Sequence, residues 1–255
     1  LIIWVSEHLN EDLATIFAQR YDENGNAIGN ELQLNSLTAG HGDTGGAYLS
    51  PLNDDGFVIT WGAPDQNGSG YGVFAQRYNS DGTAKGNEFK VHTYEYDNQY
   101  QPDIATLSDG SFIIVWTSTA VSEPIGYSSQ DGDFGGIFAQ LYDADGSTVG
   151  DEFQINTYTE GTQENPSVTA LSGGGFVVVW QNNEAAVGNK DGYDIQAKIF
   201  SENGTEIVDE FIVNFYTTNN QSHPEVDSTQ DGGFIVTWQS SVQDSSGEGV
   251  YTQRF

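Results

Sequence analysis

The residues of this chain best suited to chemistry are aspartates in short loops that also contain asparagine, serine and glycine. Oxygen donors spaced along a glycine-containing loop can surround Ca²⁺, which takes about six to eight oxygen ligands. Asp, Asn and Gly also suit ordinary solvated turns for backbone reasons, so that alternative stays open for each loop. The densest pairs are Asp131 with Asp133 and Asp191 with Asp194, and the full set of candidate calcium ligands adds Asp65 and Asp244.

A second set of residues could act as an acid pair. Asp103 and Glu225 begin two equivalent short runs, whereas the matching run in the copy between them begins with Ser167. Cleavage of a glycosidic bond needs two carboxyl groups that flank the bond. The serine in the intervening copy argues against such a pair, so glycoside hydrolysis is the weakest of the functions considered.

Other catalytic arrangements find less support. The arginines Arg20, Arg77 and Arg254 occupy one equivalent position of a repeat, which spreads them around the fold and does not cluster them as a sialidase-like site requires. The four histidines show no metal-ligand spacing, and no Gly-x-Ser-x-Gly elbow occurs. We therefore expect no enzyme activity, no catalytic residues and no cofactor other than calcium.

The elements that position these residues are set by an internal repeat. Five tryptophans recur at intervals of 55 to 64 residues, and each ends a short apolar run. A fixed recurrence of this length is typical of repeat architectures. The tryptophans are Trp4, Trp61, Trp116, Trp180 and Trp238.

Three further landmarks follow each of the first four tryptophans in the same order, and only the first of them follows Trp238. They are a run similar to FAQRY (17–21), a turn that contains Asp-Gly or Asn-Gly, and a run similar to EFQIN (152–156). In the later copies a Gln-x-x-Pro segment follows, and after it another short run such as DIATL (103–107). β-Branched and aromatic residues dominate the runs, and Asp-Gly and Asn-Gly favour hairpins.

Four short strands in each unit of about 50 residues predict an all-β, β-propeller-like domain with four-stranded antiparallel blades. We expect about five units with the first and last incomplete, divided at approximately 1–46, 47–101, 102–165, 166–223 and 224–255. The expected order from the centre outward is the Pro-containing run, the Trp run, the AQRY run and the EFxxN run. Gln-x-x-Pro is interpreted as the connection between blades, and the tryptophans as packing between neighbouring sheets.

Composition limits the partners. The chain carries 37 Asp and Glu against seven Lys and Arg, a formal net charge of −30. Such a surface repels nucleic acids and anionic membranes. No apolar run approaches the length of a membrane-spanning helix, so membrane insertion is not expected. Cysteine is absent, which excludes disulfides and thiolate metal sites.

The repeat pattern resembles a known class of proteins. Phe234–Trp238 followed by Gln243, Asp244 and Gly247, together with 75–78, 81–82 and 152–156, look like the repeats of large secreted bacterial adhesins and proteins that carry RTX calcium-binding repeats. The resemblance implies an extracellular or cell-surface location and no particular activity.

The function expected from the sequence is a non-catalytic, self-assembling structural module of a bacterial surface protein or filament, with calcium as a candidate stabilising ion. Its partners would be further copies or flanking repeats of the same polypeptide. The first alternative is a lectin-like, glycan-binding propeller, and glycoside hydrolysis is the second.

Overall fold

The computed structural model of the chain describes residues 1–7, 14–35, 46–64, 70–120, 129–183, 192–244 and 246–255. These residues form 18 β-strands arranged as five successive units, which confirms the predicted β-propeller-like fold. Candidate ligands Asp65 and Asp191 lie outside the described residues. No helix in the described part of the chain is long and apolar enough to cross a membrane.

Each unit is a group of consecutive antiparallel strands. Unit 1 contains β1 (Ile2–Glu7), β2 (Ala14–Tyr21) and β3 (Ala27–Gln33); unit 2 contains β4 (Ala47–Pro51), β5 (Phe57–Pro64), β6 (Tyr71–Tyr78) and β7 (Phe89–Lys90). Unit 3 contains β8 (Asn98–Thr106), β9 (Phe112–Thr119), β10 (Gly135–Tyr142) and β11 (Thr148–Gln154). Unit 4 contains β12 (Thr162–Ala170), β13 (Phe176–Asn183), β14 (Asp194–Phe200) and β15 (Glu206–Ile212). Unit 5 contains β16 (Gln221–Ser228), β17 (Phe234–Ser241) and β18 (Glu248–Arg254).

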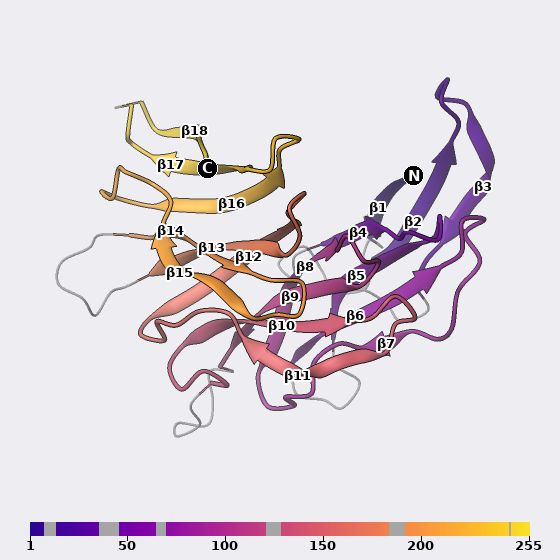
Figure 1. The fold of residues 1–255 in the computed structure, drawn as a ribbon, viewed down its shortest axis with the longest axis horizontal. Helices are drawn as coiled ribbons and strands as arrows, with labels where there is room; N and C mark the ends of the chain where they lie inside the picture. The colour runs from indigo at the N-terminus through magenta and orange to yellow at the C-terminus, as the bar shows by residue number, and fades with distance from the viewer. Residues whose placement is uncertain (8–13, 36–45, 65–69, 121–128, 184–191, 245) are drawn as a thin grey trace.

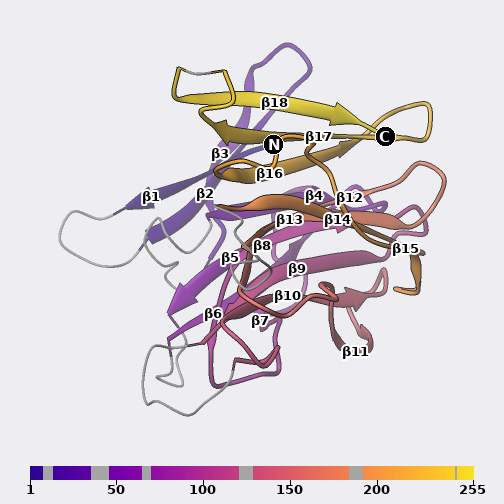
Figure 2. The same cartoon turned by 90° about the vertical axis from the view of Figure 1, so that its left-hand side faces the viewer.

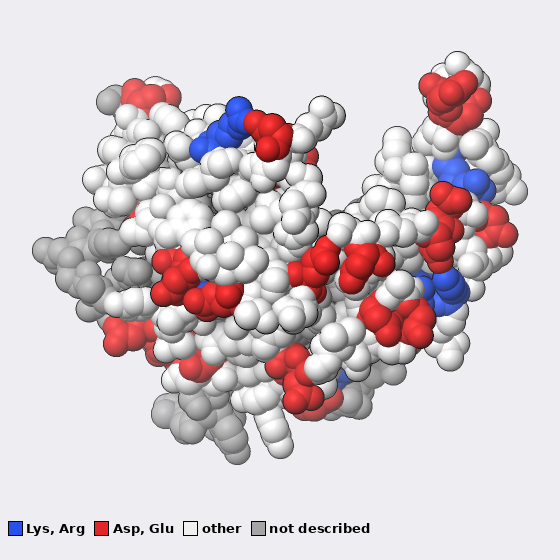
Figure 3. Space-filling model, in the orientation of Figure 1, with Lys and Arg blue, Asp and Glu red and all other residues white. Residues whose placement is uncertain are grey.

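The five units follow one another along an open arc (Figure 1, Figure 2). Strands β4, β8, β12 and β16 are the first strands of units 2 to 5, and neighbouring members of this series contact one another. They therefore form the inner wall of the arc, with the Trp run next to them and the AQRY run beyond it, as expected. The space-filling view shows the surface deeply hollowed between unit 5 and unit 1 (Figure 3).

The tryptophans pack between units, as predicted. Trp61, Trp116 and Trp180 have no exposed surface. Trp116 belongs to a core cluster that includes Val58 and Val73 of the preceding unit, and the other two have the same relation to their preceding units. Each unit alone would leave this face open to water, so burial of the tryptophan couples the stability of neighbouring units.

The Gln-x-x-Pro segments differ from the prediction. Residues 99–102 are part of the inner strand β8 and do not form a connection, so the expected boundary after residue 101 falls inside this strand. The boundaries after residues 165 and 223 fall inside β12 and β16 in the same way. The sequence suggested a connection because the longer segment suits a crossing from an outer strand to the next inner strand. In the structure the segment belongs to the inner strand, and a β-bulge accommodates its proline.

Each bulge uses a residue with left-handed backbone conformation directly before the proline. The residues are Gln101, Asn165 and His223, with φ of 51°, 54° and 52°. The glutamine of the motif has a role in the core of unit 3: Gln99 Oε1 accepts a hydrogen bond from Trp116 Nε1 at 2.8 Å, and its Nε2 donates to Ser118 Oγ at 2.9 Å. In unit 5, Gln221 Oε1 likewise accepts from Trp238 Nε1 at 3.3 Å, so in these two units the glutamine satisfies the buried indole N–H. In unit 4, Gln163 instead bonds to Asn156 and Asn182.

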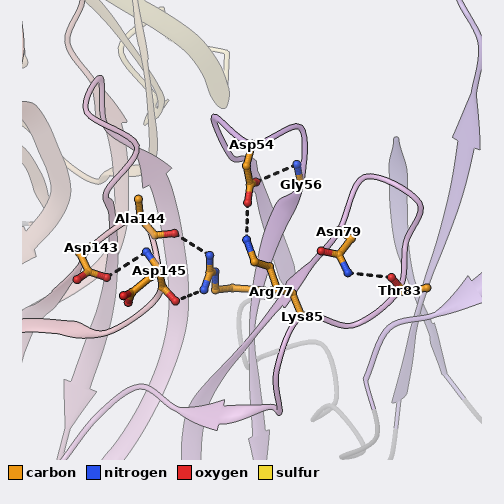
Figure 4. A network of polar contacts seen from close by, with 9 residues as sticks. All are labelled: Asp54, Gly56, Arg77, Asn79, Thr83, Lys85, Asp143, Ala144 and Asp145. Atoms are coloured by element: carbon orange, nitrogen blue, oxygen red, sulfur yellow. Dashed lines mark hydrogen bonds and ion pairs between the residues drawn. The ribbon is translucent and has the colours of Figure 1, made fainter.

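The repeated arginine connects neighbouring units. Arg77 Nη2 donates to Ala144 O at 2.7 Å, and Nη1 donates to Asp145 O in the hairpin turn of the next unit (Figure 4). This turn leaves room for the guanidinium because residue 146 is glycine, at φ 87°. In the same way, Arg20 of unit 1 donates to Asp81 O in the hairpin turn of unit 2 at 3.4 Å. These two arginines are thus structural, in agreement with the sequence analysis.

Candidate active site

One position on the inner wall carries a different polar side chain in each of units 2 to 5. The position lies thirteen residues before the tryptophan of its unit, and its strand partner is the residue just before that tryptophan. Because β4, β8, β12 and β16 are adjacent, the four side chains are neighbours at one level of the inner wall. They are Tyr48, Asp103, Ser167 and Glu225.

Asp103 is the most constrained of the four. Its Oδ1 accepts a hydrogen bond from Ile104 N at 2.8 Å, and its Oδ2 accepts one from Val168 N of the next unit at 2.8 Å. Burial nevertheless raises the pKa of its carboxyl group from 3.8 to about 7, because loss of water disfavours the charged form more than these donors favour it. The negative charge of Glu225 adds to the increase.

Ser167 lies between the two acids. Its Oγ donates to Glu225 Oε2 at 3.4 Å and accepts a hydrogen bond from Val226 N at 3.3 Å. It also lies close enough to Asp103 for its hydroxyl to oppose the rise in the pKa of that carboxyl group. The serine that argued against an acid pair in the sequence is therefore the residue that bridges the pair. The sequence alone could not show this, because the bridge depends on the spacing of three neighbouring strands.

Glu225 is more exposed than Asp103. Burial raises the pKa of its carboxyl group, whereas the hydrogen bond from Ser167 and the positive charge of His223 oppose the increase. Its exposure leaves it open to water and to a ligand in the arc. The two acids therefore share a location but have different surroundings, which is the usual way that one carboxyl group stays protonated while its neighbour is ionised.

Tyr48 was missed by the sequence analysis. Burial, with the charges of Asp103 and Glu225 beside it, raises the pKa of its hydroxyl to about 12, so the group stays protonated and can donate a hydrogen bond. The signal that could have identified it is the constant interval of thirteen residues before the tryptophan, which holds in unit 2 although the Gln-x-x-Pro motif does not.

The candidate calcium ligands do not come together in the described part of the chain. Among those residues, no group of three or more His, Asp or Glu side chains could hold a metal ion. Asp133 Oδ2 accepts from Gly161 N at 2.7 Å, and Asp131 Oδ1 accepts from Asp133 N at 3.1 Å. Both are thus engaged in the conformation of their loop, as the turn interpretation expects.

Two further candidates also have local partners. Asp194 is buried at the start of β14, where its Oδ1 accepts a hydrogen bond from Asn214 Nδ2 at 2.7 Å. Asp244 is exposed, and its Oδ1 accepts from Ser246 N and Oγ at 3.0 and 2.9 Å. Calcium binding stays a prediction, and the candidates Asp65 and Asp191 lie outside the described residues.

Solved structures share this fold. The chain is similar to an α-L-arabinofuranosidase of family GH93 from Fusarium graminearum in complex with arabinobiose (13% identity, 99% of this chain, 71% of that chain, TM-score 0.60). It is also similar to an α-L-arabinanase from Penicillium chrysogenum complexed with arabinobiose (13%, 96% and 73%, TM-score 0.58) and to a thermostable family-43 glycoside hydrolase (16%, 99% and 88%, TM-score 0.52). No protein-family model matches the sequence, and no curated protein matches it.

At this identity the likeness establishes the fold. It also corrects the expectation of a non-catalytic, self-assembling module without enzyme activity, because the similar structures are named glycoside hydrolases. The adhesin and filament roles find no support among them. The incorrect expectation arose from comparing repeats in sequence, where a residue that differs between copies counted against a site.

Proposed function

We propose that this protein is a glycoside hydrolase whose acid pair is Asp103 and Glu225. The observation that carries the proposal is the placement of both carboxyl groups at the same level of the inner wall, with raised pKa values and the Ser167 hydroxyl between them. Glycosidic bonds are commonly cleaved by two such groups, one acting as an acid and the other as a base or nucleophile. The fold shared with glycoside hydrolases supports the same class of reaction.

Asp103 is suited to be the general acid. A carboxyl group with a pKa of about 7 is largely protonated in mildly acidic solution and can transfer its proton to the oxygen of the departing sugar. Glu225 is suited to be the general base, because it is the more exposed of the two acids and because the hydrogen bond from Ser167 and the positive charge of His223 oppose the rise of its pKa that burial causes. Water then attacks the anomeric carbon while Glu225 accepts its proton, and the bond to the leaving oxygen breaks as Asp103 protonates that oxygen.

The remaining two residues orient this pair. Ser167 contacts both carboxyl groups and fixes their relative position. The Tyr48 hydroxyl remains a hydrogen-bond donor over the working pH range and is suited to a sugar hydroxyl or a carboxylate oxygen. We regard both as positioning residues.

The proposed substrate class is a neutral polysaccharide. A net charge of −30 disfavours a polymer rich in uronic acid or sulfate. The two similar structures that contain arabinobiose make arabinan and arabino-oligosaccharides the first substrates to test. Polysaccharides of this kind occur outside cells, so we also propose an extracellular location, in line with the resemblance to secreted repeat proteins.

The test is hydrolysis of a panel of neutral polysaccharides by the parent protein, Asp103→Asn and Glu225→Gln. We expect both variants to lose at least about a hundredfold in kcat on a polysaccharide, the usual contribution of a general acid or base. On an aryl glycoside with a leaving group that needs no proton, Asp103→Asn should retain far more activity than Glu225→Gln. Asp109→Asn, in an exposed turn, is the matched control and should behave as the parent does.

The pH dependence provides a second measurement. With Asp103 as the acid, kcat/KM should decrease as pH rises through about 7, because the proton needed by the leaving group is lost. Equal activity of the parent and both acid variants on every substrate would contradict the proposal.

A further inference from the structure

A second set of equivalent side chains lies on the same inner wall. It is nearer to the start of each inner strand than the acid pair, and the β-bulge separates the two sets. The position is three residues before the level of the acid pair and is paired with the residue after the tryptophan. It carries Tyr100 in β8, Glu164 in β12 and Ser222 in β16. The bulge inserts one extra residue on the inner strand between the two sets, so that positions three residues apart lie on the same face of the sheet.

Glu164 is held in place by its neighbours. Its Oε1 accepts a hydrogen bond from Gln181 Nε2 at 2.8 Å, and Gln181 Oε1 accepts one from His223 N of the next unit at 3.0 Å. Gln181 is buried, whereas Glu164 keeps part of its surface exposed. A partly exposed carboxylate on a buried support is preorganised for a ligand.

Two tyrosines flank this carboxylate. The Tyr193 hydroxyl bonds to Glu164 and to Asn183, and the Tyr193 carbonyl accepts a hydrogen bond from Gln221 N at 2.8 Å. Tyr100 is close enough to both Glu164 and Tyr193 for their charges to raise the pKa of its hydroxyl, although burial is the larger cause. Both rings are partly exposed. They supply apolar faces with a polar edge, beside a group that accepts hydrogen bonds.

The face on which this second set opens differs from the opposite face. Connections after the second and fourth strands of each unit end on it, and they carry exposed aromatic side chains: Tyr71, Tyr96, Phe134, Tyr158 and Phe215. The hairpin turns of the opposite face carry Asp54, Asp81, Asp109, Asp145 and Asp231. The first face therefore offers aromatic surfaces beside exposed acids such as Glu95 and Glu160, and a ligand with apolar ring faces and hydroxyl edges can contact both.

We propose that Glu164, with Tyr100 and Tyr193, forms a subsite for one neutral sugar unit next to the acid pair, in which the carboxylate accepts hydrogen bonds from sugar hydroxyls. This inference rests on the proposed glycoside hydrolase function and adds a specificity-determining residue to it. Glu164 also repels a carboxylate on the bound sugar, so the subsite selects neutral units over uronic acids. The tyrosine rings contact the ring face of the same unit.

The experiment compares parent, Glu164→Gln and Tyr193→Phe, with Glu23→Gln in an exposed turn as the matched control. Hydrolysis of an arabino-oligosaccharide gives kcat and KM, and calorimetric titration of the same sugar into each protein on an Asp103→Asn background gives Kd. We expect Glu164→Gln to raise KM and Kd about tenfold or more, the effect of losing one charge-assisted hydrogen bond, with kcat within about threefold of the parent. Glu23→Gln should change none of these values.

The outcomes separate this inference from the proposed function. Hydrolysis by the parent with unchanged KM and Kd in Glu164→Gln overturns the subsite and leaves the function standing. Binding without hydrolysis, lost in Glu164→Gln, overturns the function and supports the subsite. A uronic-acid oligosaccharide that binds the parent as tightly as a neutral one overturns the selectivity, and absence of any sugar binding overturns the subsite entirely.

Discussion

Replacement of Asp103 by Asn should make the protein more stable in neutral solution, even though it removes a proposed catalytic group. The folded structure raises the pKa of this carboxyl group from 3.8 to about 7. Both states are neutral at this position below pH 3.8, and above that pH the unfolded chain ionises more readily than the folded one. The folded state therefore loses stability as pH rises from about 4 to about 7, and the loss is complete above that range.

The magnitude follows from the shift. About three pKa units at 1.36 kcal/mol per unit correspond to about 4 kcal/mol. Asn has nearly the same shape and no charge, so the difference in unfolding free energy between Asp103→Asn and the parent should increase by about this amount between pH 4 and pH 8. Asn has one acceptor oxygen fewer, so Ile104 N or Val168 N would lose its hydrogen bond. This loss would shift the difference in unfolding free energy by about 1 kcal/mol at every pH and would not change how that difference depends on pH.

Urea unfolding followed by tryptophan fluorescence at several pH values measures this difference. Acids that titrate identically in both proteins cancel, which isolates Asp103. A difference that does not change with pH would refute the argument, because it would place the carboxyl group in an environment similar to water. A variant less stable than the parent at pH 8 by several kcal/mol would instead identify Asp103 as a connector between units 3 and 4.

Three other changes test the fold and the ion prediction. Trp116→Ala should lower the unfolding free energy by about 3–5 kcal/mol through the cavity it leaves, measured by urea unfolding, and a parent-like midpoint would contradict the packing role. Gly146→Ala should lower the melting temperature more than Gly25→Ala does. Both glycines have positive φ, 87° and 80°, but only at position 146 would the new Cβ come within 2.7 Å of Arg77 Nη1. Equal melting temperatures of the two variants would show that the guanidinium moves aside without cost. Calcium should raise the melting temperature more than sodium at matched ionic strength if the predicted sites exist, and equal increases would reduce the effect to screening of the −30 charge.

The architecture could be predicted from the sequence because its signals are local and repeated. Tryptophans such as Trp61 and Trp116 end apolar runs at intervals of 55 to 64 residues, and short strands with Asp-Gly turns allow few alternatives. The strand order within a unit followed from the same pattern. The extent of the inner strand could not be predicted, because a residue in left-handed conformation before proline, such as Gln101, is unfavourable locally and depends on the surrounding sheet.

The candidate site was only partly predictable. Asp103 and Glu225 were identified as inner-strand carboxyl groups, but their relation through Ser167 depends on contacts between strands of different units. The aspartate-rich loops attracted attention because their composition suits a cation, and that composition equally suits the turn hydrogen bonds that Asp131 makes in the structure. Composition identifies possible donors, whereas only the fold determines which donors converge.

The thirteen-residue interval has a consequence for how such a protein can evolve. Duplication of one unit supplies several copies of the same inward-facing slot, while the tryptophan on the adjoining strand maintains contact with the previous unit. A mutation in one slot can therefore alter the chemistry of the inner wall while the tryptophan contact between neighbouring units is kept. Tyrosine, aspartate, serine and glutamate in the four slots are what independent divergence from a common ancestor would produce. Active-site asymmetry can thus arise one residue at a time in a scaffold that remains symmetric.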